Sequence, residues 1–387
     1  MSLVCTELRL RNYRNFEELR LELPPTGAVI IGDNGSGKTN LVEALYYLEI
    51  FRSFRGAADE QLVRFGTDAF FVRGVFQDAM EGTPPRRFEV SAAYEPRART
   101  KRVSLDGVEP DRIGDALGQL GAVVFSPSDV DIVAGGPGER RRFLDIVLSL
   151  NAPGYLDALQ RYRHLLRHRN AMLRAGSDDT VIEAFDDQMI AHGTRLMVER
   201  GAWVAGHAAR FAELYRDISG GRSATLGYAP DVGVEDGGSG AIAAAFRARL
   251  QRVARRERER GVTLAGPHRD DVALVLETES GGVDLRQYGS GGQLRTGAVA
   301  LRLVESDTIL AARGRRPLML LDDVFAELDP GRSRRIVRLL EEGAHGQVVL
   351  TAPKETDVML GPLTDGAAGR VARWRIRDGR VSGAAAS

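Results

Sequence analysis

The sequence predicts an α/β domain that is interrupted by a mostly helical subdomain. Strand patterns open the chain: "LRLRNYRNF" and "LRLEL" alternate apolar and polar residues, and "AVII" (28–31) is a short apolar run. From "GERRRFLDIVLSL", near residue 138, to "FAELYRDI", apolar residues recur at helical spacing. Strand patterns then return in "DVALVLET", "PLMLLDD" and "GQVVLTA". We therefore expect one α/β domain in two halves, residues 1–137 and 261–387, with a helical insert at 138–260.

Further elements follow in the same order along the chain. "FEVSAAYE" and "RVSLDGV" have strand character, and Asp106–Gly107 favours a hairpin turn at the end of the second. The Gly-rich stretch 220–240 is expected to be a loop with room for a short strand. "IAAAFRARLQRVARRERERG" predicts a helix that ends at Gly261.

Composition restricts the classes of protein and of partner. The 387 residues carry 53 Lys and Arg against 53 Asp and Glu, so any nucleic-acid surface has to be a local patch. A single cysteine, Cys5, excludes an intramolecular disulfide and a cysteine-based zinc site. No apolar run approaches the length of a membrane span, and the N-terminus lacks a signal-peptide pattern. We expect a cytoplasmic protein with no membrane partner.

A complete phosphate-loop motif follows the apolar run at 28–31. Its pattern is Gly32-x-x-x-x-Gly37-Lys38-Thr39, the Walker A motif, and a helical stretch comes next. Backbone N–H groups of such a loop cradle phosphates, the lysine reaches the β- and γ-phosphates, and the threonine hydroxyl binds Mg²⁺. The chain has only three lysines, so a lysine in this loop is informative. The residues expected to contact ATP are Gly32, Asp33, Asn34, Gly35, Ser36, Gly37, Lys38, Thr39 and Asn40.

A Walker B strand is predicted at "PLMLLDD" (317–323), where an apolar run ends in two carboxylates. Asp322 is expected to hold Mg²⁺ together with Thr39. Asp323 is placed to orient or deprotonate the attacking water, so Asp323 and Lys38 are the expected catalytic residues. An apolar run that ends in aspartate is common at strand ends, and the Walker A motif upstream makes this one significant.

A second glycine cluster, "YGSGGQLRT" (288–296), precedes a helical stretch about 250 residues after the phosphate loop. Ser290, Gly291, Gly292 and Gln293 would then sit at a helix N-terminus, where backbone N–H groups favour an anion. Since Walker A already holds one side of the γ-phosphate, this cluster makes sense if it contacts the ATP of a second subunit. We expect a C₂ homodimer with ATP at its interface; a plain glycine turn into a helix is the alternative.

The order Walker A, Ser-Gly-Gly-Gln, Walker B resembles an ABC-type ATPase head. The resemblance implies a D-loop at Glu327, Leu328 and Asp329, which crosses the dimer interface near the nucleotide of the partner. Thr351 stands at the switch position, where transporters carry histidine, and Asp323 stands where most of the superfamily has glutamate. The shorter carboxylate suggests slow hydrolysis. The implied fold is an ABC-type P-loop ATPase head, split in sequence by the helical subdomain.

Nearly the whole chain is similar to the RecF family of bacterial recombination mediators. The stretches that carry the resemblance are "LRLRNYRNF", "GDNGSGKTNLVEALYYL", "RSFRG", "VVFSPSDVDIVAGGPGERRRFLD", "RHRNAML", "GPHRDD", "GSGGQLRT" and "LLDDVFAELD". Gly292 departs from the family in following the general ABC form. The resemblance implies a weak, DNA-stimulated ATPase that binds double-stranded and gapped DNA as an ATP-dependent homodimer. It also implies that the protein acts with RecO and RecR in gap repair, and that it takes part in replication, recombination and the SOS response.

Several arginines are candidates for contact with DNA phosphates. In "LQRYRHLLRHRNAMLR", Arg163, Arg167, Asn170 and Arg174 fall on one helix face. Arg55, with Arg52, lies near Walker A, and Arg14 is a further candidate neighbour of the phosphates. His268 and Arg269 would couple the DNA face to the nucleotide site, or form a buried pair. Solvated helix faces in an arginine-rich protein are the alternative, and no base-reading motif is visible.

Other classes of protein compete with this interpretation. An ABC-type nuclease would need a metal-dependent domain after Walker B, for which the roughly 60 residues beyond Pro330 leave no room. A transporter ATPase or a switch without a DNA role remains the main alternative, although a transporter head usually carries the switch histidine. A pure interaction scaffold would keep ATP binding without DNA-stimulated hydrolysis.

Overall fold

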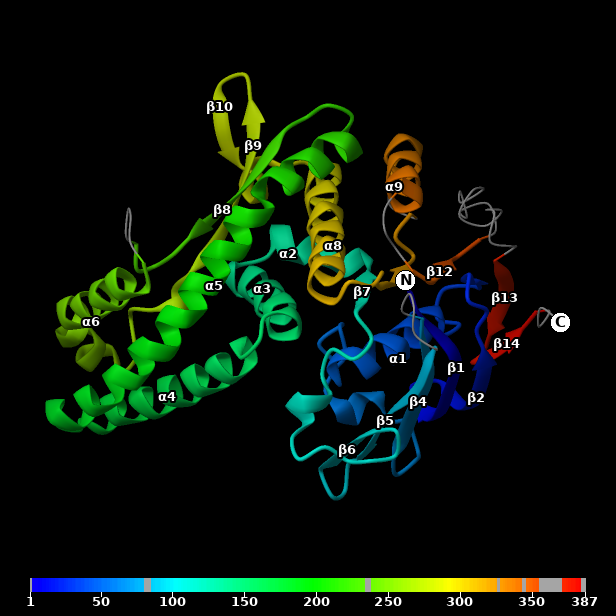
Figure 1. Cartoon of the computed structure of the whole chain (residues 1–387), viewed down its shortest axis with the longest axis horizontal. Helices are drawn as coiled ribbons and strands as arrows, with labels where there is room; N and C mark the ends of the chain where they lie inside the picture. Colours follow the sequence, from blue (N-terminus) through cyan, green and yellow to red (C-terminus); the bar gives the residue numbers. More distant parts are fainter. Residues whose placement is uncertain are drawn as a thin grey trace. The chain divides into compact units, whose positions relative to one another are not determined.

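The computed structural model describes residues 2–79, 85–233, 238–325, 328–342, 346–354 and 371–383. The chain divides into two compact units, of which unit 1 comprises Met1–Asp129 and Leu301–Ser387, and unit 2 comprises Val130–Ala300. Figure 1 shows the elements of both units in sequence colours.

A six-stranded, largely parallel sheet organises unit 1. Its strand order is β14-β13-β3-β12-β11-β7, in which only β14 runs antiparallel to its neighbour. The strands are β3 (Gly27–Ile31), β7 (Ala122–Phe125), β11 (Leu318–Asp322), β12 (Val348–Ala352), β13 (Ala372–Arg377) and β14 (Arg380–Ser382). All residues of β3, β7 and β11 are buried, which explains their continuous apolar runs. Because the strands are parallel, the ends of β3, β11 and β12 meet at one edge of the sheet.

A second, antiparallel sheet of unit 1 has the strand order β2-β1-β4-β5-β6. Its strands are β1 (Ser2–Tyr13), β2 (Phe16–Glu22), β4 (Phe70–Ala79), β5 (Arg86–Glu95) and β6 (Thr100–Leu105). Helix α1 (Lys38–Ile50) contacts strands of both sheets and is buried over most of its surface (Figure 1). Because α1 packs against strands on two sides, apolar residues surround it, and they do not form a single apolar stripe.

The predicted hairpin turn at Asp106–Gly107 is confirmed. Both residues adopt positive φ, 50° and 79°, and Leu105 bridges Val108 across the turn. Positive φ at both central positions is typical of a type I′ turn, which suits the right-handed twist of the strands that it joins. Single turns of 3₁₀ helix complete the connections: η1 (Asp59–Leu62), η2 (Ile113–Ala116), η3 (Pro127–Asp129) and η4 (Pro267–Arg269).

Unit 2 is mostly helical, as the sequence predicts. Its helices are α2 (Val130–Ala134), α3 (Pro137–Asn151), α4 (Tyr155–Ala175), α5 (Asp179–Ser219), α6 (Ser239–Arg260) and α7 (Leu285–Tyr288). A small antiparallel sheet β10-β9-β8 consists of β8 (Ala224–Ala229), β9 (Asp271–Thr278) and β10 (Gly281–Asp284). The 41-residue α5 packs along α4 and also contacts α6 and β8 (Figure 1).

Two buried arginines tie the helices of unit 2 together. Arg169 of α4 is 3% exposed and contacts Asp186 at 2.7 Å and the fully buried Glu257 at 2.8 Å. Arg200 of α5 is equally buried and contacts Asp145 and Asp270. Removal of one partner would leave a buried charge uncompensated, which typically costs about 3–5 kcal/mol. These arginines are therefore structural.

The limits of the compact units differ from the boundaries expected at 137/138 and 260/261. Residues 261–300 cluster with unit 2 because β9 pairs with β8 and contacts α3. The boundary after Ala300 falls inside helix α8 (Gly291–Arg313). Helix α9 (Pro330–Glu342) belongs to unit 1. Within the described ranges, no helix is both long and apolar enough to cross a membrane.

Candidate nucleotide site

The glycine-rich loop at 32–37 connects β3 to α1. Gly37 has a φ of 115°, which only glycine adopts readily, and it directly precedes the first turn of α1. A Cβ at Gly32 would lie 2.4 Å from the backbone oxygen of Ile376, so no larger residue fits there. Lys38, 4% exposed, curls back over the loop and donates from Nζ to the carbonyl oxygen of Gly32 at 2.7 Å. The sequence therefore folds locally as the motif requires.

Asn15, in the turn between β1 and β2, forms hydrogen bonds with the phosphate loop and with the start of α1. Its Nδ2 donates to the backbone oxygen of Ser36 at 3.0 Å, and its Oδ1 accepts from Asn40 at 2.8 Å. The N–H of Gly379 donates to the same Ser36 oxygen at 3.2 Å. Asn15 is not among the residues predicted from the sequence, where its only signal is its place in "RNYRNF".

Two carboxylates follow β11 at the same edge of the sheet. Asp322 is 3% exposed, and its Oδ1 accepts from Thr39 Oγ1 at 3.0 Å and from Thr351 Oγ1 at 2.9 Å. Burial raises the pKa of Asp322 to about 6, and the neighbouring charge of Asp323 acts in the same direction. A buried carboxylate beside a hydroxyl is the oxygen donor set that Mg²⁺ prefers.

Asp323 takes an unusual backbone conformation, with a φ of 47°. Aspartate and asparagine tolerate this left-handed region better than other residues with a Cβ. Its N–H donates to Thr351 Oγ1 at 3.0 Å, and its carboxylate lies 3.7 Å from Lys38 Nζ. Thr351, at the end of β12, thus positions both acidic residues.

The loop fits a phosphate chain on a further observation. Among the described residues, the Ser36 hydroxyl is buried without a hydrogen-bond partner. It lies 2.8 Å from where a Cβ of Gly32 would stand, at a position that the backbone oxygen and side chain of Ile376 also border. A bound phosphate oxygen would satisfy this orphaned group. The residues present therefore fit both ATP and Mg²⁺.

The Ser-Gly-Gly-Gln cluster forms the start of α8 within unit 2. The N–H of Ser290 donates to Gln293 Oε1 at 2.7 Å, and the carbonyl oxygen of Ser290 accepts from the N–H groups of Gln293 and Leu294. Gln293 is buried and caps the helix through its side chain. In the described structure, the N–H groups of Gly291 and Gly292 donate to no other residue. Contact of Ser290, Gly291, Gly292 and Gln293 with the ATP of a second subunit remains a prediction, in which the Gln293 side chain is already used by the cap.

Comparison with known proteins decides the family. The family model described as "RecF/RecN/SMC N terminal domain" matches residues 4–361. The DNA replication and repair protein RecF of Salinibacter ruber is 35% identical over 91% of this chain and 85% of that protein. The RecF protein of Bacillus cytotoxicus is 34% identical over 87% of this chain and 88% of that protein. This chain belongs to the RecF family.

Solved structures confirm the predicted ATPase-head fold. One is described as the recombination mediator protein RecF with ATP in the RecFOR pathway. It has a TM-score of 0.87 and 28% identity, and the match covers 99% of this chain and 98% of that chain. Its counterpart, described as RecF-ATPrS, has a TM-score of 0.86 and 29% identity, with 99% of both chains covered. An Smc head domain from Pyrococcus furiosus, at 15% identity and a TM-score of 0.57, shares the fold over 98% of this chain and 95% of its own.

The expected D-loop of this RecF-family chain is described in part. Glu327 lies outside the described residues, whereas Leu328 and Asp329 precede α9. Asp329 Oδ1 accepts from the N–H of Arg332 at 3.0 Å, and this hydrogen bond lowers the pKa of the exposed Asp329 carboxyl. Asp329 therefore caps α9, while its expected role at a dimer interface remains a prediction.

The candidate DNA residues on α4 fall into two groups. Arg163, Arg167 and Arg174 are exposed, as expected, although Arg163 also donates to Asp145 at 3.0 Å. Asn170, expected on the same face, is not free, because its Oδ1 accepts from the N–H and hydroxyl of Thr263 at 2.7 Å. Spacing along a helix defines a face but does not reveal what packs on it.

The basic residues near the phosphate loop also differ in exposure and in their partners. Arg55 is exposed, and its Nη1 lies 3.5 Å from Asn40 Oδ1 at the start of α1, while Arg52 is exposed as well. Arg14 instead makes a bidentate pair with the fully buried Glu43, at 2.8 and 2.9 Å. The expectation that Arg14 neighbours the phosphates is therefore replaced by a structural role.

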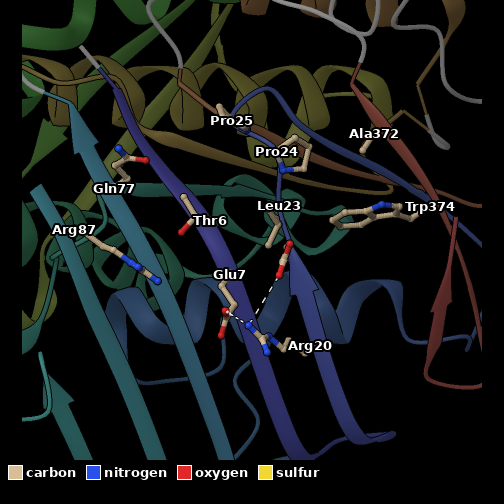
Figure 2. Close-up of a pocket in the computed structure, with 11 residues that line it drawn as sticks. Thr6, Glu7, Arg20, Leu23, Pro24, Pro25, Gln77, Arg87, Ala372 and Trp374 are labelled. Carbon is tan, nitrogen blue, oxygen red and sulfur yellow. Dashed lines mark hydrogen bonds and ion pairs between the residues drawn. The ribbon is translucent and has the colours of Figure 1, made fainter. Parts of the chain in front are cut away.

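Figure 2 shows a cavity of unit 1 with a volume of about 680 Å³. No residue of the phosphate loop is among those that line it. Strands β1, β2, β4, β5 and β13 line it. Arg20 pairs there with Glu7 at 2.9 Å and approaches Glu22 at 3.9 Å, and Arg73 also contacts Glu7. Since these charges compensate one another, the cavity does not compete with the loop as a phosphate site.

His268 in "GPHRDD" is held neutral. Its Nδ1 contacts Tyr162 Oη at 2.7 Å, and its Nε2 lies 3.2 Å from the carbonyl oxygen of Thr263. Burial lowers the pKa of His268 to about 4, and the charge of Arg269 contributes in the same direction. Arg269 is exposed and lies 3.8 Å from Asp231. His268 is therefore held by hydrogen bonds, and the ion pair of Arg269 is largely exposed, so neither residue has the buried ion-pair role that the sequence offered as the alternative.

Acid should therefore destabilise the protein through His268. The unfolded chain takes up this proton near pH 6.5, whereas the folded chain does so only near pH 4, so stability falls as pH drops between these values. The loss amounts to about 3 kcal/mol at most. In His268→Asn, whose Oδ1 can still accept from Tyr162, denaturant midpoints measured from pH 7.5 to 4.5 should fall less steeply than in the wild type. Parallel curves would contradict the prediction.

Proposed function

We propose that this RecF-family chain is an ATP-dependent DNA-binding switch of recombinational repair. Mg·ATP drives formation of a homodimer that holds duplex or gapped DNA, and slow hydrolysis releases it. The names of its relatives, a DNA replication and repair protein and a recombination mediator in the RecFOR pathway, support a role at single-strand gaps and stalled forks alongside RecO and RecR.

One observation carries the proposal: two separate parts of the chain each present groups that are suited to a nucleotide phosphate. Unit 1 supplies a loop with an orphaned Ser36 hydroxyl, a lysine and two acidic residues. Unit 2 supplies an exposed helix N-terminus with unused N–H groups at Gly291 and Gly292. Used as half-sites, these two parts form whole sites when two copies meet in C₂ symmetry.

The residues of unit 1 have distinct chemical tasks. Lys38 is positioned to exchange its contact with the Gly32 carbonyl for a phosphate oxygen. Thr39 and Asp322 would hold Mg²⁺, which neutralises charge that develops on the phosphates when bound. Asp323 would orient the attacking water and accept its proton, with Thr351 fixing the carboxylate.

Anisotropy of a labelled gapped duplex tests this function directly. The wild type should bind at least about tenfold more tightly with Mg·ATP than with Mg·ADP or without nucleotide, since only ATP offers a γ-phosphate to the second half-site. Lys38→Ala should bind equally in all three conditions, with circular dichroism to verify its fold. Equal binding by the wild type in all conditions would overturn nucleotide control. No DNA binding at all would favour an ATPase switch without a DNA role.

A further inference from the structure

A basic cavity of about 280 Å³ lies within unit 2, formed by α3, α4, α5 and η4. Four arginines line it, Arg141, Arg142, Arg163 and Arg200, against a single carboxylate, Asp145. Arg163 and Arg200 share Asp145, whereas Arg141 is half-buried and Arg142 is exposed, so the lining carries more positive than negative charge.

Two consecutive arginines near the start of α3, Arg140 and Arg141, differ sharply in their surroundings. Arg140 is buried, contacts Asp271 at 2.7 and 2.9 Å, and donates to the carbonyl oxygens of Val133 and Gly135. Arg141 is half-buried and makes one backbone contact, from Nη1 to the carbonyl oxygen of Asp270 at 2.5 Å. Arg140 therefore has a structural role. In the described structure, Nε and Nη2 of Arg141 donate no hydrogen bond.

The carboxylates around the cavity are already engaged. Asp145 accepts from Arg163 at 3.0 Å, from Arg200 at 2.8 Å and from Tyr155 at 2.7 Å. Asp270 is occupied by Arg200 at 2.9 Å, and by Tyr228. Among the described residues, no carboxylate lies within 4 Å of the Arg141 or Arg142 guanidinium groups. Burial, followed by the charge of Arg200, lowers the pKa of Arg141, although Asp270, Asp271 and Asp145 act in the opposite direction.

A backbone donor lies beside the free side of Arg141. Gly138, in the first turn of α3, lines the cavity, and its N–H has no acceptor in the described part of the chain. Arg141 Nη2 lies 4.0 Å from where a Cβ of Gly138 would stand, so guanidinium and helix N-terminus face the same space. The positive end of a 15-residue helix adds to the attraction for an anion.

We propose that this cavity binds a backbone phosphate of DNA, with Arg141 as its central ligand and Arg142 and the Gly138 N–H as further donors. The proposal rests on the DNA-binding function proposed above and places one contact within it. The cavity offers donors but no free acceptor: Asp145 is engaged, and His268 is hydrogen-bonded on both nitrogens. It therefore recognises phosphate and not base edges, and binding through it is independent of DNA sequence.

The salt dependence of duplex binding in Mg·ATP tests the proposal with Arg141→Gln. Loss of one phosphate contact should reduce the slope of log K against log[salt] by about 0.9 and weaken binding about tenfold near 0.1 M salt. The melting temperature should stay the same or rise, because a repelled cation is removed. A purely structural arginine would lower the melting temperature instead.

Two further variants serve as controls. Arg255→Gln removes an exposed arginine of α6 that pairs with Glu259, and it should keep the wild-type slope. Arg141→Lys retains the charge and should also keep the slope, with a smaller loss of affinity.

Several outcomes would overturn the proposal. One is a wild-type slope and affinity in Arg141→Gln; another is a lower melting temperature with an unchanged slope. Loss of binding to poly-L-glutamate with an unchanged DNA isotherm would instead assign the cavity to an acidic protein segment. If the wild type itself fails to bind duplex, both the proposed function and the phosphate site fall, whereas the first three outcomes leave the proposed function intact.

Discussion

Ser290→Arg is expected to abolish ATP-dependent self-association while leaving ATP binding intact. Ser290 is exposed at the start of α8, where the N–H groups of Gly291 and Gly292 are unused. An arginine there fills the space that a γ-phosphate of the partner would need. Sedimentation velocity with and without Mg·ATP should show a dimer for the wild type only, and fluorescent ATP should bind both proteins equally.

The structure indicates that this variant will fold. The hydrogen bond from the Ser290 N–H to Gln293 belongs to the backbone and survives the substitution. The hydroxyl contact that is lost is long, 3.4 Å, and contributes little. Ser280→Arg, at an exposed turn of the same unit, is the matched control and should dimerise normally. If Ser290→Arg also dimerises with ATP, the glycine cluster is a structural turn and the two-half-site proposal fails.

Asp323→Asn should separate ATP binding from hydrolysis. Asparagine tolerates the φ of 47° as well as aspartate does, and its amide oxygen can keep the contact with Thr351. The change therefore removes the proposed base without straining the backbone. Loss of a general base typically costs about 10²–10⁴ in rate. We expect single-turnover hydrolysis to fall by at least about 10² and ATP-bound dimers on DNA to become long-lived.

A control for this variant is available in another turn. Asp106 has a φ of 50° and is exposed, so Asp106→Asn makes the same chemical change in the same backbone conformation. It should hydrolyse ATP at the wild-type rate. Unchanged hydrolysis in Asp323→Asn would show that another group activates the water. Loss of ATP binding would instead show that Asp323 contributes to the binding of ATP.

The sequence predicts the local parts of the site well, because their geometry is set by near neighbours. The strand, loop and helix around Lys38 and the helix start at Gly291 follow from spacing, glycine and apolar runs. The same holds for the Asp106–Gly107 hairpin, where two residues determine the turn.

Contacts between distant segments escaped prediction for a physical reason. Asn15 supports the phosphate loop, Glu43 takes up Arg14, and Thr263 engages Asn170 only because packing brings these pairs together. Gln293 has the residue type that a phosphate contact would need, yet its side chain closes the cap of α8. Patterns along the chain reveal periodicity and polarity, but not which partner a side chain meets.

The placement of β3 has a consequence for synthesis of the chain. Both neighbours of β3 in the sheet, β12 and β13, lie beyond residue 347, and the Gly379 N–H supports the loop through Ser36. The first 40 residues therefore encode a phosphate loop that cannot take its final form on the ribosome until almost the whole protein has emerged. We therefore expect a chain truncated before β12 to lack the strand neighbours that hold the phosphate loop, and to bind ATP less tightly than the full chain.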